Sequence, residues 1–68
     1  MPYINIRITD DQVTKEQKAE MIKGVTQVMV DVLGKNPDRT FVVIDEVNTD
    51  NWGVGGESLT EARKRQSK

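Results

Sequence analysis

The chain of 68 residues contains neither cysteine nor histidine. Their absence excludes a disulfide framework, effectively excludes a structural zinc site, and excludes catalysis by a thiol or an imidazole. A chain this short buries only about 60% of the surface that its unfolded form exposes, and it usually needs a disulfide, a metal or partner subunits for stability. Because the first two are ruled out, we expect association between subunits to supply the missing burial.

The sequence also lacks an excess of charge of one sign and a long apolar run. Its formal net charge is −1, with acidic and basic residues interspersed, so the sequence predicts no nucleic-acid-binding surface. No apolar stretch approaches the roughly 20 residues of a membrane span, and no signal-peptide pattern precedes the first strand. We therefore expect a cytoplasmic protein without nucleic-acid or membrane partners.

The one basic stretch is "EARKRQSK", which closes the sequence. Charge runs at the end of a chain are usually solvated and poorly ordered. We therefore interpret residues 1–68 as a single domain in which residues 60–68 form a mobile basic tail.

Two segments have the patterns of β-strands. Residues 3–9 alternate between apolar and polar side chains, with Ile4, Ile6 and Ile8 on one face, which predicts a half-buried strand. The segment "TFVVIDEV" of residues 40–47 is apolar on both faces at its centre, as is typical of strands in parallel sheets.

The residues between these two strands predict one long helix. Thr14 and Gln17 have the spacing of a capping box, and apolar residues then recur every three or four positions as far as Leu33. Gly34 is expected to end the helix in the left-handed conformation. Strand, helix and strand together form a β-α-β unit with a right-handed crossover, so the two strands are parallel.

A single helix covers only one face of a two-stranded sheet. The second predicted strand has apolar side chains on both faces, so nothing in this chain covers those on the other face, and both edges of the sheet are open. Joining and stacking the sheets of several subunits removes both defects. We therefore predict an obligate homo-oligomer.

The segment "NTDNWGVGGES" is rich in glycine and turn residues. The spacing of its glycines matches neither G-x-G-x-x-G nor G-x-x-x-x-G-K-[ST], so it does not support a phosphate-binding loop. We interpret it as a small hairpin or packing arm with Trp52 as its anchor. The predicted fold class is therefore α+β, a β-α-β subunit with a C-terminal hairpin.

Few side chains are available for acid–base chemistry. Asp45 and Glu46 are adjacent on a predicted strand and point to opposite faces, so they do not form a carboxylate pair. Asp10 and Asp11 lie in a polar turn, where we expect them to be solvated. Because there is no histidine to activate a serine or threonine, a side-chain base would have to be a lone carboxylate or lysine.

The remaining candidate base is the N-terminus itself. Methionine aminopeptidases remove Met1 when the next residue is small, which would leave Pro2 with a free secondary amine. An unperturbed α-amino group has a pKa of about 7.7–8.0 and burial lowers that pKa, so such an amine is a competent general base near neutral pH. The alternative interpretation is that Pro2 only caps an edge strand, because it has no N–H to donate to the sheet.

Four stretches, in order along the chain, resemble the 4-oxalocrotonate tautomerase family: "PYINIRIT", "TKEQKAEMIKGVT", "FVVIDEV" and "NWGVGGE". The resemblance spans residues 2 to about 58 and includes the short chain length. It implies that two β-α-β subunits pair into a four-stranded sheet with both helices on one face. Members of the family commonly assemble three such dimers into a hexamer, and the sequence leaves both the dimer and the hexamer open.

The resemblance further implies an isomerase that works without a cofactor or a metal. Its activity would be keto–enol tautomerisation of a small 2-hydroxy-enoate or 2-oxo acid. Pro2, freed of Met1, would be the general acid–base. Trp52 would line the pocket, and the backbone N–H near Ile8 would contribute to substrate binding.

This sequence departs from the family at two positions where relatives use arginine to hold a dicarboxylate. Val13 and Phe41 occupy the matched positions. Arg39, two residues before Phe41, would share its face on a strand and is the first candidate replacement. Arg7 and Lys35 are further candidates, and for all three the alternative is solvated surface charge. The apolar residues at the matched positions favour a smaller or more apolar enol acid.

Two other functions fit the same sequence. A hydratase or dehalogenase of the same superfamily would keep Pro2, but it would need a carboxylate to activate water, and the sequence shows none that is well placed. A non-catalytic oligomeric binding module would use Pro2 only as the cap of an edge strand.

Overall fold

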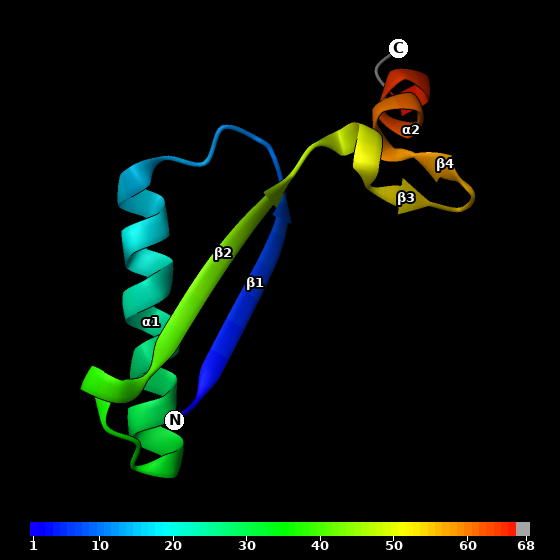
Figure 1. Ribbon diagram of the computed structural model, residues 1–68. Coiled ribbons are helices and arrows are strands. Elements are labelled where there is room, and N and C mark those ends of the chain that lie inside the picture. Colours follow the sequence, from blue (N-terminus) through cyan, green and yellow to red (C-terminus); the bar gives the residue numbers. More distant parts are fainter. Residues whose placement is uncertain (67–68) are drawn as a thin grey trace.

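The computed structural model describes residues 1–66 and contains the predicted β-α-β unit (Figure 1). Its elements are β1 (Tyr3–Thr9), α1 (Lys15–Leu33) and β2 (Phe41–Val47). β1 and β2 pair in parallel, from Tyr3 opposite Phe41 to Thr9 opposite Val47. The predicted parallel pairing is therefore confirmed. A short 3-10 turn, η1 (Pro37–Arg39), leads from α1 into β2.

The ends of α1 are those that the sequence predicts. The Thr14 hydroxyl accepts a hydrogen bond from the Gln17 N–H at 3.0 Å, and the Gln17 side-chain oxygen accepts one from the Thr14 N–H at 2.9 Å. This reciprocal capping box satisfies two donors at the start of the helix. At the other end Gly34 has φ 64°, the left-handed conformation that glycine adopts without steric cost.

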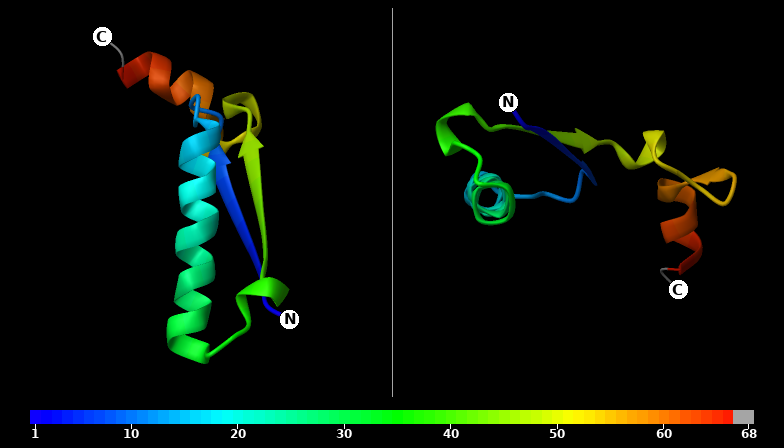
Figure 2. Two further views of the ribbon diagram at one scale, coloured as in Figure 1. Left: turned by 90° about the vertical axis from the view of Figure 1, so that its left-hand side faces the viewer. Right: turned by 90° about the horizontal axis from the view of Figure 1, so that it is seen from below.

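The two faces of the β1–β2 sheet have different surroundings (Figure 2). Alternate side chains of both strands are half-buried on the face toward α1, namely Ile4, Ile6, Ile8, Val42 and Ile44. The opposite face is bare, with Tyr3 64% exposed, Phe41 51% and Val43 43%. At its centre the Asn5 side chain donates to Asp45 Oδ2 at 2.8 Å, and the Arg7 guanidinium lies 3.6 Å from the same carboxylate.

The chain is too extended to form a closed core by itself. Its radius of gyration is 15.6 Å, whereas a compact domain of this length has about 11 Å. Its accessible surface is 5330 Å², against about 4,300 Å² for a folded monomer of this mass. Among the described residues Ala62, at 5% exposure, is the only buried apolar residue. These values support the predicted association between subunits, and the four-stranded sheet between two chains stays a prediction.

Beyond β2 the chain forms a C-terminal lobe, residues 48–66, at the end of the sheet farthest from the N-terminus (Figure 1). Its elements are η2 (Thr49–Asn51), β3 (Gly53–Val54), β4 (Glu57–Ser58) and α2 (Leu59–Gln66). β3 and β4 pair antiparallel, which confirms the predicted hairpin. Gly55 and Gly56, with φ 59° and 89°, form its two-residue turn. Glycine is favoured there because two successive positive φ angles strain most residues that have a Cβ.

Helix α2 corrects one expectation from the sequence. Residues 60–66 were expected in a basic tail, and they are helical, with Ala62 buried. Residues 67 and 68 of that predicted tail lie outside the described residues. The overlooked signal is Ser58 followed three residues later by Glu61, which is capping-box spacing, and the Ser58 hydroxyl accepts from the Glu61 N–H at 3.3 Å. In residues 1–66, neither helix is long and apolar enough to cross a membrane.

Candidate active site

Pro2 lies half-buried at the start of β1, beside the start of β2. Its carbonyl oxygen accepts a hydrogen bond from the Phe41 N–H at 3.0 Å. This bond, together with the fixed proline ring, holds the backbone of Pro2 against the sheet. Met1 is 82% exposed, so the fold of a single chain leaves that residue accessible to a peptidase.

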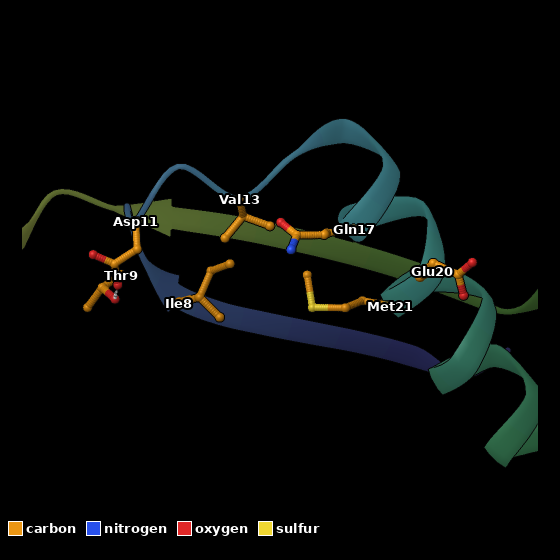
Figure 3. Close-up of a pocket in the computed structure, with 7 residues that line it drawn as sticks. All are labelled: Ile8, Thr9, Asp11, Val13, Gln17, Glu20 and Met21. Carbon is orange, nitrogen blue, oxygen red and sulfur yellow. Dashed lines mark hydrogen bonds between the residues drawn. The ribbon is translucent and has the colours of Figure 1, made fainter.

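An open pocket of about 580 Å³ lies between the far end of β1 and the first turns of α1 (Figure 3). Its lining residues are Ile8, Thr9, Asp11, Val13, Gln17, Glu20 and Met21. The side chains of Ile8 and Met21 point toward each other between the strand and the helix, and Val13 lies above them. The pocket therefore has an apolar base and a rim of polar side chains.

Two carboxylates line this pocket, and Asp11 is exposed there, as the sequence predicts. They are Asp11 and Glu20. Asp11 accepts from Arg63 Nη1 at 2.6 Å and Nη2 at 3.2 Å, and it also accepts from the Thr9 hydroxyl. These hydrogen bonds, those from Arg63 above all, lower the pKa of Asp11 to about 2, and the same pairing raises the pKa of Arg63. Asp11 is therefore an ionised acceptor and a weak base at neutral pH.

The lowered pKa of Asp11 can be measured directly. We expect the ¹³C NMR signal of its carboxyl carbon to titrate with a midpoint near 2, and in Arg63→Gln the midpoint should rise toward about 4, the ordinary value for aspartate. Because the pKa is depressed on folding, the pairing stabilises the folded chain above about pH 4, and this contribution is lost as the pH falls toward 2. A midpoint near 4 in the unsubstituted protein would contradict the bidentate contact.

The structure separates the residues that the sequence analysis assigned to one site. Pro2, Arg39 and Phe41 lie at the start of the sheet, whereas Ile8 lies in the pocket at the other end of β1 (Figure 1). Six residue steps of an extended strand span about 20 Å. Trp52 is half-buried in the C-terminal lobe, where its carbonyl oxygen accepts from the Leu59 N–H at 2.7 Å. One chain therefore does not bring Pro2 together with Ile8 or Trp52.

The three cations proposed to replace the family arginines have different positions. Arg39 lies in η1 rather than on a strand, so the argument that it shares the face of Phe41 is wrong. Arg7 lies mid-strand on the bare face, where it pairs with Asp45. Lys35 follows the C-terminal end of α1 and is exposed.

The cation that does reach the pocket rim is Arg63, which the sequence analysis placed in a tail. It contacts Asp11, while Val13, at the matched position of one family arginine, lines the pocket with an apolar side chain. The signal for this pairing is absent from the local sequence, because 52 positions separate Asp11 from Arg63. Among residues 1–66 no group of three or more acidic side chains is arranged to hold a metal ion.

Comparison with known proteins agrees with this arrangement of elements. The sequence model of the family described as tautomerase enzyme matches residues 2–62. A probable tautomerase K2 of Dickeya dadantii is 66% identical over 67 residues, which cover 98% of this chain and all of the relative. The crystal structure of DmpI from Helicobacter pylori is 45% identical, with a TM-score of 0.85 over 93% of this chain and 97% of that one.

A third relative bears on assembly. The heterohexamer 4-oxalocrotonate tautomerase from Chloroflexus aurantiacus is 26% identical and superposes with a TM-score of 0.81, covering 90% of this chain and 97% of that chain. Relatives of this fold thus include an oligomeric enzyme, and matches to named tautomerases argue against a purely structural module. The family match over residues 2–62 and the 66% identity to a probable tautomerase show that this chain belongs to the tautomerase family and is an isomerase.

Proposed function

We propose that this chain is a cofactor-free keto–enol tautomerase of a small 2-hydroxy-enoate or 2-oxo acid, with Pro2 as general acid–base after removal of Met1. The observation that carries this proposal is the anchored start of β1, where the 3.0 Å hydrogen bond from the Phe41 N–H holds Pro2 at the sheet. The absence of histidine and cysteine leaves the amine of Pro2 as the base best suited to neutral pH.

In the proposed reaction one proton moves and nothing is added. The neutral amine of Pro2 accepts the proton of the 2-hydroxyl group as the enol oxygen becomes a carbonyl. The resulting ammonium delivers the proton to a carbon of the double-bond system conjugated with the enol oxygen. That carbon becomes a CH₂ or CH group of the keto acid. Base and acid are thus the same nitrogen in its two protonation states, and this requires a pKa near the working pH.

We propose that a second chain completes the site. Pro2 and the pocket lie at opposite ends of β1, and among residues 1–66 no strand pairs with the edge of β1 that faces away from β2. If two β1 strands pair antiparallel along these edges, Pro2 of one chain lies beside the Ile8 end of the other. The backbone N–H near Ile8 is then available to the substrate oxygen. This pairing is the four-stranded sheet that the resemblance implies, and three such dimers make the proposed hexamer.

The lining of the pocket supports a monocarboxylate substrate. Ile8, Val13 and Met21 are apolar, and the carboxylate of Glu20 would repel a second carboxylate on the substrate, whereas the charge of Asp11 is paired with Arg63. The two arginines that clamp a dicarboxylate in relatives are replaced by Val13 and Phe41. Bidentate arginine contacts are the strong form of carboxylate recognition, so without them a dicarboxylate gains little over a monocarboxylate.

A substrate panel tests this proposal. We expect protein whose intact mass shows loss of Met1 to ketonise a monocarboxylate such as enol phenylpyruvate with a kcat/KM at least about tenfold above that for a dicarboxylate dienol, because one repelled carboxylate costs about 1.4 kcal/mol or more. Initial rates followed by ultraviolet absorbance give both values. Preference for the dicarboxylate would contradict the proposed substrate class, and full activity with Met1 retained would contradict the role of Pro2.

One observation favours a second candidate, the hydratase or dehalogenase reaction. That reaction needs a carboxylate to activate water, and Asp11 and Glu20 both line the pocket. Asp11 is the weaker choice, because a carboxylate with a pKa of about 2 has little tendency to take a proton from water. Release of halide from a 3-haloacrylate, measured beside the enol panel, distinguishes the two reactions.

A further inference from the structure

The contact between Asp11 and Arg63 joins two parts of the chain that are distant in sequence and belong to different elements. Asp11 belongs to the loop of residues 10–14 between β1 and α1, and Arg63 belongs to α2 in the C-terminal lobe. The two guanidinium nitrogens hold the two carboxylate oxygens at 2.6 Å and 3.2 Å. Such a fork fixes the orientation of both side chains, which a single point contact does not.

The loop that Asp11 belongs to is a wall of the pocket and is strained. Asp11 and Val13 line the pocket, and Gln12 between them has φ 62°. A residue with a Cβ adopts this left-handed conformation at a cost, and it persists only where surrounding contacts hold it. Several contacts hold the loop: Asp11 bonds to Thr9 and Arg63, the Asp10 N–H donates to the Val47 oxygen at 2.8 Å, and the capping box holds Thr14.

Helix α2, which carries Arg63, is attached at its start to the backbone of Trp52. Ala62, the neighbour of Arg63, is buried in the lobe. The Thr60 hydroxyl donates to Asp50 Oδ1 at 2.5 Å, which ties α2 to η2. The first residue of α2, Leu59, donates its N–H to the Trp52 oxygen at 2.7 Å. Side chain and backbone contacts therefore connect the pocket wall to the segment that carries Trp52.

We propose that Arg63 is a positioning residue for substrate binding. Through Asp11 it holds the strained loop of residues 10–14 in the conformation that forms the pocket wall. It also fixes the position of the Trp52 segment relative to that wall. Arg63 does not touch the substrate in this account. Its effect on catalysis rests on the proposed function, whereas its effect on the loop does not.

The test uses hydrogen exchange and steady-state kinetics on the full chain. Arg63→Gln and Asp11→Asn remove one partner each, and Arg63→Lys keeps the charge but loses the fork. The matched control is Arg65→Gln, because Arg65 is also in α2 but pairs with Glu57 inside the lobe. Size-exclusion chromatography of each variant checks that the assembly is retained.

We expect Arg63→Gln and Asp11→Asn each to speed amide exchange in residues 11–13 and to raise KM by about three- to tenfold. The kcat should stay within about twofold of the parent value. These sizes correspond to the loss of one charge-assisted contact. The double variant should match the single ones, because the partners act as a pair. Arg63→Lys should give an exchange rate and a KM between those of the parent protein and Arg63→Gln. Arg65→Gln should match the parent protein in both.

The two readouts separate failure of this proposal from failure of the proposed function. Exchange and KM that match Arg65→Gln would overturn the positioning role, and so would faster exchange with an unchanged KM. A loss of kcat without a change in KM would also overturn it. If the protein proves inactive toward enol acids, the exchange measurement alone still decides whether Arg63 holds the loop.

Discussion

Replacement of Pro2 by alanine is expected to lower the rate of ketonisation by about 10²- to 10⁴-fold, which is the usual contribution of a positioned general acid–base. Alanine is also small, so Met1 should be removed from both proteins, and the comparison is between two free amines. Proline holds its nitrogen in a ring at the start of β1, where its carbonyl oxygen is bonded to the Phe41 N–H. Alanine leaves a primary amine, and without the ring the N–Cα bond of residue 2 rotates freely.

The measurement is the kcat for an enol acid with proteins of verified intact mass. Assembly should be unchanged, because the Phe41 N–H bonds to a backbone oxygen that alanine also has. A Pro2→Leu variant is a second control, because a large residue at position 2 should retain Met1. An unchanged rate in Pro2→Ala would remove Pro2 from the mechanism, even though the chain belongs to the tautomerase family.

The second large effect is expected on the bare face of the sheet. Val43 is 43% exposed there, between Phe41 and the carboxylate of Asp45. If other subunits cover this face, Val43→Asp places a charge in the interface, and the penalty for burying an unpaired charge is several kcal/mol. We expect this variant to lose the parent assembly and to be largely unfolded as a smaller species, since a single chain buries little apolar surface.

Light scattering coupled to size-exclusion chromatography reports the assembly, and circular dichroism reports the fold. The matched control is Val43→Thr, which keeps the branched shape and places no charge, and should cost only about 1–2 kcal/mol. We expect it to retain the assembly at the same concentration. Val43→Asp protein that elutes with the mass of the parent would show that the bare face is not an interface.

The sequence predicts those elements of the fold whose signals lie within one segment of the chain. β1, α1 and β2 follow from the spacing of neighbouring residues, because a two-residue or three-to-four-residue apolar period and a capping box are properties of one segment. The hairpin at Gly55 and Gly56 is predictable for the same reason. Helix α2 was missed because a basic composition was weighed above the Ser58 and Glu61 cap.

The residues assigned to the site stay a prediction, and their arrangement could not be predicted from the sequence. The family resemblance names Pro2, Ile8 and Trp52, and the structure leaves Pro2 far from both Ile8 and Trp52 within one chain. Arg39 was misjudged because a 3-10 turn, rather than a strand, precedes Phe41, and the alternation of faces holds only in a strand. Asp11 is exposed as predicted, but its pairing with Arg63 was missed because the partner is 52 positions away in sequence.

The sequence by itself therefore determined the β-α-β unit, and it supplied the prediction of partner subunits and the N-terminal proline as the candidate base. These depend on composition and on periodicity along the chain. Only the tertiary structure shows that α2 lies against the loop after β1, where Arg63 donates hydrogen bonds to Asp11 at the rim of the pocket. The path of the chain sets such a contact across 52 positions, and no pattern within either segment encodes it.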